Sequence, residues 1–274
     1  MRDHPAQKRL ALEELLAHNL GMRKLRRLQR SRKAPAMPAV LASEAAFMDN
    51  LPFALTVAQV RVAAEICNDL ESDKPMLRLV HGDVGSGKTV MAALAALRAT
   101  DNGFQTAITA PTELLAEQHL RTFSEWLEPL GVKPVWLSGK VTGKKRIEAL
   151  ERISGDAEIV IGTHALMQKG VEFQRLGLVI VDEQHRFGVD QRMDLLEKGR
   201  TPGGQAHQLI MTATPIPRTL AMTAYAGMDV SVIDELPPGR KPVNTVVISN
   251  QRRGEVIERV ANACSTGQQA YWVC

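Results

Sequence analysis

The stretch Gly82-x-x-x-x-Gly87-Lys88-Thr89 constrains the fold of this chain more than any other feature of its sequence. It lies between an apolar run and a helical stretch, and this order is typical of a phosphate-binding P-loop. Glycines let the backbone fold around phosphates, and the N–H groups at the start of the following helix bind the anion. The residues predicted to form this nucleotide site are Gly82, Asp83, Val84, Gly85, Ser86, Gly87, Lys88 and Thr89.

Apolar runs and helical stretches alternate along most of the chain. The runs lie at 76–80, 105–110, 133–137, 157–161, 176–181 and 207–212. The helical stretches lie at 6–30, 56–70, 88–99, 113–128, 143–153, 189–198 and 254–264, and one further strand is expected at 243–248. Alternation of this kind predicts an α/β fold with a mostly parallel sheet covered by helices on both faces. The two prolines of "SRKAPAMPAV" predict a linker after the first helix.

Two adjacent carboxylates, Asp182 and Glu183, follow the apolar run "LVIV". A solvated turn would explain an isolated Asp-Glu pair. Ligands of a parallel sheet bind beyond the carboxyl ends of its strands, so Asp182 is expected beside the P-loop, where it and Thr89 can bind Mg²⁺. Glu183 is then free to polarise the attacking water, while Gln184 and His185 can sense the phosphate. Lys88 would face the β- and γ-phosphates, and together these residues predict ATP hydrolysis.

The composition narrows the class of partner. Residues 1–33 contain ten basic and three acidic residues, so the basic character of the chain lies mainly in this first segment. Such a segment suits a polyanion, although a solvated helix face fits equally well. Aromatic residues make up only 4% of the chain, which disfavours a surface built on base stacking. The three cysteines (Cys67, Cys264 and Cys274) have no metal or disulfide spacing, and no secretory signal or membrane span is evident, so we expect a cytoplasmic protein.

Several further motifs follow the same strands in a fixed order. They are "LPFALTVAQ", "GDVGSGKT", "APTELLAEQH", "GTHAL", "DEQHRFGV", "TATPIPRTLAMTAYA" and "DELPPGR". Through residues 51–240 this set resembles the motor of superfamily 2 helicases, and most closely the bacterial helicases that drive branch migration. The transcription-repair coupling translocases share "TATPIPRTL" and are the alternative within that superfamily. The resemblance implies a RecA-like domain.

The resemblance also implies roles for matching positions. Phe53, Thr56 and Gln59 would recognise the adenine, although an ordinary helix start would look similar. Backbone-gripping turns for one DNA strand would be formed by Pro111, Thr112, Glu113, Gly162, Thr163 and His164. A coupling motif, with its strand between those of the P-loop and Asp182, would contain Thr212, Ala213, Thr214 and Arg218 and could report the nucleotide state through His185.

The resemblance divides the chain into a basic connector helix and linker (1–50), a helicase ATP-binding domain (51–240) and the start of a second RecA-like domain (241–274). The connector is expected to pack on a neighbouring domain; direct DNA contact by Arg23, Lys24, Arg26 and Arg27 is the alternative.

The function implied is ATP-dependent remodelling of stalled forks and Holliday junctions, by a monomer that contacts duplex arms and no membrane. A nucleotide-binding switch is the alternative outside this class. The tail "AYWVC" resembles a first strand of the second lobe, so we expect an incomplete motor that is nearly inactive alone.

Overall fold

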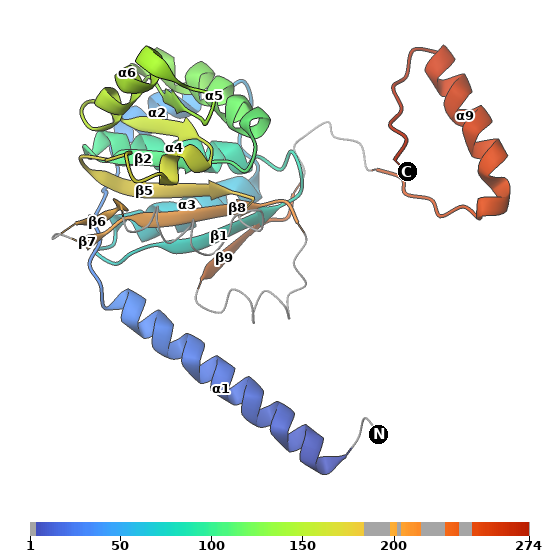
Figure 1. Ribbon diagram of the computed structural model, residues 1–274, viewed down its shortest axis with the longest axis horizontal. Coiled ribbons are helices and arrows are strands. Elements are labelled where there is room, and N and C mark those ends of the chain that lie inside the picture. The colour runs from blue at the N-terminus through green and yellow to red at the C-terminus, as the bar shows by residue number, and fades with distance from the viewer. Residues whose placement is uncertain (1–3, 184–197, 202–203, 215–227, 236–242, 274) are drawn as a thin grey trace. The chain divides into compact units, whose positions relative to one another are not determined.

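The computed structural model describes residues 4–183, 198–201, 204–214, 228–235 and 243–273 (Figure 1). The chain divides into two compact units, Met1–Pro237 and Pro238–Cys274. In the described part of the chain, no helix combines the length and apolar character needed to cross a membrane.

A seven-stranded sheet forms the centre of the first unit. In spatial order its strands are β3 (Val135–Leu137), β4 (Ile159–Gly162), β2 (Gln105–Thr109), β5 (Leu176–Asp182), β8 (His207–Thr212), β1 (Leu77–Gly82) and β9 (Asp229–Ile233). Every neighbouring pair is parallel, which confirms the predicted α/β fold. Because all the strands run in one direction, the loops that follow them gather at one edge of the sheet.

Apolar side chains cover both faces of the sheet. Strand β5 shows why an inner strand is a continuous apolar run in the sequence. Leu178 and Ile180 belong to the apolar cluster on one face, whereas Val179 and Val181 belong to the cluster on the other. A strand buried on both faces gains from an apolar side chain at every position, so its sequence is a continuous apolar run.

Of the helices of this unit, those after α1 fall into two groups, according to the face of the sheet that they cover. The helices are α1 (Pro5–Arg30), α2 (Leu41–Asn50), α3 (Val57–Glu71), α4 (Lys88–Asp101), α5 (Glu113–Leu127) and α6 (Gly143–Ile153), with the short turns η1 (Glu128–Leu130) and η2 (His164–Met167). Helices α2 to α5 supply side chains to one cluster, and α6 and η2 supply the other. The helix predicted at 189–198 falls almost entirely outside the described residues.

Residues 31–40 and α2 belong to this packed unit, although the sequence predicted a linker there and missed the helix. The backbone N–H groups of Ala34 and Met37 donate to main-chain carbonyls at 2.8 and 2.7 Å. Met37 and Phe47 are fully buried in the cluster that also covers β1 and β5. Residues 33–40 form no helix or strand, as a linker predicts, and they are nevertheless partly buried, because prolines prevent regular structure without preventing burial. The predicted domain boundary at residue 50 stays a prediction.

His207, the first residue of β8, ties this entering segment to the sheet. Its Nδ1 accepts a hydrogen bond from the backbone N–H of Met76 at 3.0 Å, so the hydrogen of the neutral ring is on Nε2. Nε2 donates to the carbonyl of Pro35 at 2.8 Å. Burial lowers the pKa of this imidazole. The neutral ring is thus the form that satisfies both partners.

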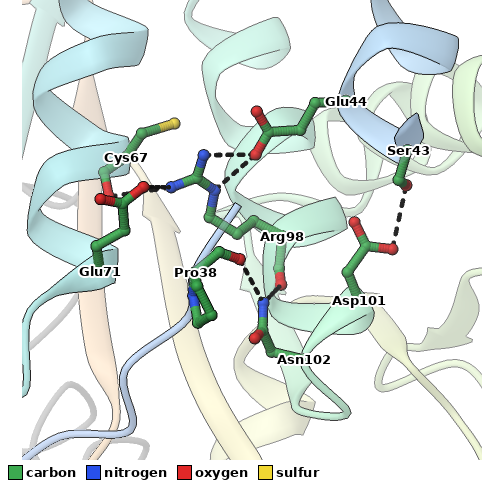
Figure 2. Close-up of polar contacts among 8 residues, drawn as sticks. All are labelled: Pro38, Ser43, Glu44, Cys67, Glu71, Arg98, Asp101 and Asn102. Carbon is green, nitrogen blue, oxygen red and sulfur yellow. Dashed lines mark hydrogen bonds and ion pairs between the residues drawn. The ribbon is translucent and has the colours of Figure 1, made fainter. Parts of the chain in front are cut away.

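Arg98 on α4 joins three helices through a buried guanidinium (Figure 2). Its Nε donates to Oε1 of Glu44 on α2 at 2.7 Å, and its Nη1 donates to Oε1 of Glu71 on α3 at 3.0 Å. The same Nη1 donates to the carbonyl of Cys67 at 3.2 Å. Only 3% of Arg98 is exposed, so the guanidinium depends on these partners for its hydrogen bonds. Burial raises the pKa of the Cys67 thiol to about 11.

Further differences from expectation concern the edge of the sheet, a small hairpin and the second unit. The edge strand β9 and the small antiparallel hairpin of β6 (Arg200–Thr201) and β7 (Gly204–Gln205) were not predicted. In the second unit the described residues form η4 (Asn250–Arg252) and α9 (Arg253–Ser265), and the predicted helix at 254–264 is confirmed. The predicted strand at 243–248 is wrong, and residues 270–273 form none either. An extended segment becomes a strand only when another strand pairs with it.

Candidate active site

The predicted P-loop connects β1 to α4, and its backbone favours glycine at Gly85 and Gly87, whose φ values of 76° and 91° are left-handed. Gly87 is the N-cap of α4 with a left-handed φ of 91°, a conformation that side chains disfavour. A Cβ on Gly87 would lie 2.2 Å from Nε2 of Gln59, and a Cβ on Gly82 would lie 2.4 Å from Oγ of Ser86. A side chain at either glycine would therefore have to displace the neighbouring side chain of Gln59 or Ser86.

Lys88, the first residue of α4, lies over the loop and near the carboxylates. Its Nζ donates to the carbonyl oxygens of Gly82 at 2.7 Å and Asp83 at 2.9 Å. Burial lowers the pKa of Lys88, and the charges of Asp182, Glu183 and Asp83 oppose that shift. The two motifs that the sequence separates by almost a hundred residues therefore meet in one electrostatic environment.

The polar groups around the loop fit a magnesium ion with phosphates. The hydroxyl of Ser86 is buried and has no hydrogen-bond partner among the described residues, so it has capacity for a ligand. Across the described ranges no group of three or more His, Cys, Asp or Glu side chains could hold a metal by itself. A hydroxyl from Thr89 and one carboxylate from Asp182 would need phosphate oxygens and water to complete the coordination. Mg²⁺ is commonly bound in this way.

The segment upstream of the P-loop is attached to it through Gln59. Thr56 caps α3, with its Oγ1 accepting from the N–H of Gln59 at 3.3 Å and its own N–H donating to Oε1 of Gln59 at 2.9 Å. Nε2 of Gln59 then donates to the carbonyl of Ser86 at 2.8 Å. Phe53 is 44% exposed and lies edge-on to the ring of Trp126 at 6.1 Å between centroids. Thr56 and Gln59 thus form the cap of α3, and Gln59 also contacts the P-loop.

Asp182 ends β5 at the same edge of the sheet. Its carboxylate is largely buried, and Oδ2 lies 2.8 Å from Nε2 of His119, a buried residue of α5. No role was predicted for His119 from the sequence. The sequence feature that could have indicated a role is a polar residue within the apolar stripe of an amphipathic helix. The buried neighbours of His119 in that stripe are Ala116, Phe123 and Leu127.

Glu183 is held by the residues that follow β8. Its φ of 49° lies in the left-handed region, a strained conformation that active sites can maintain. Its N–H donates to the carbonyl of Met211 at 2.9 Å, and its carboxylate accepts from Oγ1 of Thr212 at 3.1 Å and the N–H of Ala213 at 3.0 Å. The N–H of Thr214 donates to Oγ1 of Thr212 at 3.2 Å. The predicted coupling motif therefore contacts the predicted catalytic carboxylate.

The position of β8 explains this contact. As predicted, β8 pairs with β5 on one side and with β1 on the other. Gln184, His185 and Arg218 lie outside the described residues, so coupling through His185 stays a prediction. In the described part of the site, the connection runs through Glu183.

The two predicted DNA-gripping turns lie side by side. Residues 111–113 follow β2, and residues 162–164 start at the last residue of β4. Thr109 of β2 lies opposite Gly162. The N–H of Ala110 donates to the carbonyl of Gly162 at 3.0 Å, which fixes the first turn against the second.

The side chains of these turns are not equally accessible. Thr112 caps α5 by accepting from the N–H of Leu115, and Glu113 forms an ion pair with Lys140. Thr163 is buried, whereas His164 is exposed. Of the predicted contact residues, the exposed imidazole of His164 is thus the side chain best able to reach an external partner.

Comparison with known families gives one extended match. The family described as DEAD/DEAH box helicase matches residues 58–223, which is more than half of the chain. This range includes the P-loop, both candidate DNA-facing turns, the Asp182–Glu183 pair and the residues after β8.

Similar curated proteins are named ATP-dependent DNA helicase RecG. The protein from Escherichia coli strain K12 is 59% identical over 273 residues, which is 99% of this chain and 39% of that protein. The protein from Aquifex aeolicus is 44% identical over 265 residues, or 96% of this chain and 33% of that protein. The chain thus spans about two fifths or less of the length of these relatives.

Solved structures show the same fold. RecG bound to a three-way DNA junction matches with a TM-score of 0.84 and 41% identity, over 96% of this chain and 35% of that one. The DEAD-box helicase Mss116, bound to single-stranded RNA and a nucleotide analogue, matches with a TM-score of 0.63 over 84% of this chain and 51% of that one. At 18% identity, the second match concerns the fold alone. The parallel sheet with its helices is therefore a RecA-like helicase domain.

Proposed function

The chain belongs to the DEAD/DEAH box helicase family, and from this premise we propose that it is the ATP-binding motor domain of a DNA helicase that remodels branched DNA. The observation that carries the proposal is the meeting of the P-loop and the Asp182–Glu183 pair at one sheet edge, with β8 between them. The relatives named RecG, and the structure of one such protein on a three-way DNA junction, support branched DNA as the substrate. Stalled forks and Holliday junctions are the junctions that we propose.

In this proposal the site binds and hydrolyses ATP with Mg²⁺. Lys88 exchanges its two carbonyl contacts for the β- and γ-phosphates, while Thr89 and Asp182 hold the cation. Mg²⁺, when bound, would offset the negative charge of the phosphates. Glu183 accepts a proton from the attacking water, because an ionised carboxylate near the γ-phosphate can act as a general base. Gln59 supports the loop through Ser86 and, with Phe53, is available to the adenine.

We infer that nucleotide turnover reaches the rest of the motor through β8. Thr212 and Ala213 hold both oxygens of the Glu183 carboxylate, and β8, which ends at Thr212, pairs with the P-loop strand β1 on its other side. A change in the position of Glu183 during hydrolysis would therefore alter the hydrogen bonds of the segment after β8.

DNA would be held through its backbone by the paired turns at 111–113 and 162–164. Phosphate contacts position a protein without reading the base sequence, as a motor that moves along any DNA requires. Binding should then weaken strongly with salt and depend little on sequence. We propose a monomer that acts in the bacterial cytoplasm on the duplex arms of the junction.

Nucleotide binding gives the first test. Titration of the chain with a fluorescent ATP analogue and Mg²⁺ should show binding that Lys88→Ala abolishes or greatly weakens, because the cation facing the phosphates is lost. Lys74→Ala is the matched control, since Lys74 is an exposed lysine that precedes the opposite, amino-terminal end of β1. Equal affinity in the wild-type chain and Lys88→Ala would contradict the assignment of the site.

Junction dependence gives the second test. A chimera in which this chain replaces the matching segment of the E. coli relative can be assayed for ATP turnover with three-way junctions, linear duplex and no DNA. We expect junctions to give the largest stimulation, with little difference between junctions of unrelated sequence. Nucleotide binding without any stimulation by DNA would instead favour a nucleotide switch.

A further inference from the structure

The imidazole of His119 forms a hydrogen bond with the carboxylate of Asp182, and this bond has no role in the function proposed above. His119 lies on the buried face of α5, and its Nε2 is 2.8 Å from Oδ2 of Asp182. Its side chain is 9% exposed and that of Asp182 is 12% exposed, so the contact is largely removed from water. A polar pair buried to this degree is stable only when its hydrogen bond is formed.

The imidazole is also fixed by packing. Its ring lies edge-on to the ring of Phe123, one helical turn along α5, with 6.5 Å between centroids and 84° between planes. Phe123 is fully buried. The donor therefore has one well-defined position relative to the end of β5.

The chemistry of the pair leaves one oxygen of the carboxylate for another ligand. An ionised carboxylate offers only acceptors, so the hydrogen lies on Nε2 of His119 and is donated to Oδ2 of Asp182. Oδ1 then remains at the edge of the sheet that also carries the P-loop. Metal-binding side chains generally need such an outer partner to hold their orientation.

We infer that His119 is a positioning residue, which orients the Asp182 carboxylate for Mg²⁺ and so sets the affinity of the nucleotide site for the cation. This inference rests on the proposed function, because it assumes that Asp182 binds Mg²⁺ with ATP. It goes beyond that function by assigning control of metal affinity to a residue of α5, the helix that begins at the turn proposed to hold DNA.

The test is a Mg²⁺ titration of nucleotide binding, with variants matched for shape. His119→Phe keeps a ring against Phe123 but removes the donor, so the Mg²⁺ concentration for half-maximal binding should rise about 10-fold or more. His119→Gln retains a donor at the end of the side chain and should recover part of that loss. Glu125→Ala, an exposed substitution on the same helix, should leave the titration unchanged.

A second readout avoids dependence on the nucleotide signal. The affinity for Mn²⁺ in the presence of ATP, measured by electron paramagnetic resonance, should fall in His119→Phe in parallel with the Mg²⁺ result. In an Asp182→Asn background His119→Phe should have no further effect on either metal, because the carboxylate that it orients is absent.

Three results would overturn the inference. One is unchanged metal dependence in folded His119→Phe and His119→Gln. Another is a loss of nucleotide affinity that is equal at all Mg²⁺ concentrations, which would make the pair a structural tether between α5 and β5. The third is a wild-type chain whose nucleotide binding does not depend on a divalent cation, and this result alone would also remove the proposed function.

Discussion

Replacing Arg98 by methionine should cost this domain a large part of its stability. The substitution keeps an unbranched side chain of similar length in a site that is only 3% exposed, and it removes the guanidinium. Glu44, whose side chain is 19% exposed, then loses its cation in a largely buried position, and the carbonyl of Cys67 loses a donor. Bonds to charged groups contribute about 1.5–3 kcal/mol each, and removing one partner of a buried ion pair costs roughly 3–5 kcal/mol. Since Glu71 is half-exposed and can rehydrate, we expect a loss of about 3–4 kcal/mol.

Substitutions at the partners of Arg98 should destabilise the domain in a predicted order. Glu71→Gln should lower the free energy of unfolding by less than about 1 kcal/mol, because an exposed pair gains little. Glu44→Gln should lower the free energy of unfolding by an intermediate amount, about 1–3 kcal/mol. The double variant Arg98→Met/Glu44→Leu should be more stable than Arg98→Met, because it removes the carboxylate that would otherwise be buried without a partner.

Urea denaturation at 25 °C measures these values. The fluorescence of Trp126 is a suitable probe, since its ring lies edge-on to that of Phe47 on α2 at 6.5 Å between centroids. Replacing Trp136 and Trp272 by phenylalanine in every variant isolates that signal. The melting temperature of Arg98→Met should fall by about 6–16 °C. A loss below about 1 kcal/mol in Arg98→Met, or an equal loss in Glu71→Gln, would refute the reasoning from burial.

Three further predictions concern the chemistry and stability of single groups. Glu183→Gln should bind Mg-ATP normally but slow single-turnover hydrolysis in the chimera by about 10²-fold or more, and hydrolysis at the wild-type rate would exclude Glu183 as the base. Since burial lowers the pKa of His207, the unfolded state binds the proton more readily, and the free energy of unfolding should fall as the pH drops below 6.5, by up to ~1.4 kcal/mol per pH unit. Urea titrations between pH 7.5 and 5 should show this slope and a flatter one in His207→Gln; equal slopes would count against the assignment. Iodoacetamide at pH 8 should modify exposed Cys264 well before Cys67, whose pKa is about 11, as peptide mapping by mass spectrometry can establish, and faster modification of Cys67 would contradict its burial.

The parts of the fold that the sequence predicted are those whose local pattern and burial agree. The central strands were found because a strand covered on both faces is apolar throughout, as in β5. The P-loop was found because its glycines are favoured by backbone conformation and close packing, which any sequence with this loop must respect.

The parts that were missed depend on partners far along the chain. Helix α2 is short, and Phe47 is its only fully buried side chain, so its pattern was too weak to distinguish from a linker. The edge strand β9 has two exposed valines, Val230 and Val232, and lacks the apolar run of the inner strands. Conversely, residues 243–248 are rich in β-branched side chains, and that preference did not produce a strand without a neighbour.

The candidate site shows the same division. Lys88, Asp182 and Glu183 were predicted from motifs, and the structure brings them into one environment. His119 was not predicted, because its contact with Asp182 spans 63 residues of sequence and no local motif records it. The contact of Thr212 with Glu183 likewise depends on the order of strands in the sheet.

The anchoring of residues 33–37 has a mechanical consequence. Hydrogen bonds of 2.7 to 2.8 Å tie this stretch to the end of α3, to β7 and to His207. A pulling force applied through the chain ahead of residue 33 must break these bonds before it reaches the strands, whose carboxyl ends lie about 20 Å from their amino ends. In an optical trap the first rupture should therefore detach residues 33–40 and lengthen the tether by about 25 Å, while α2 and the sheet still hold their load.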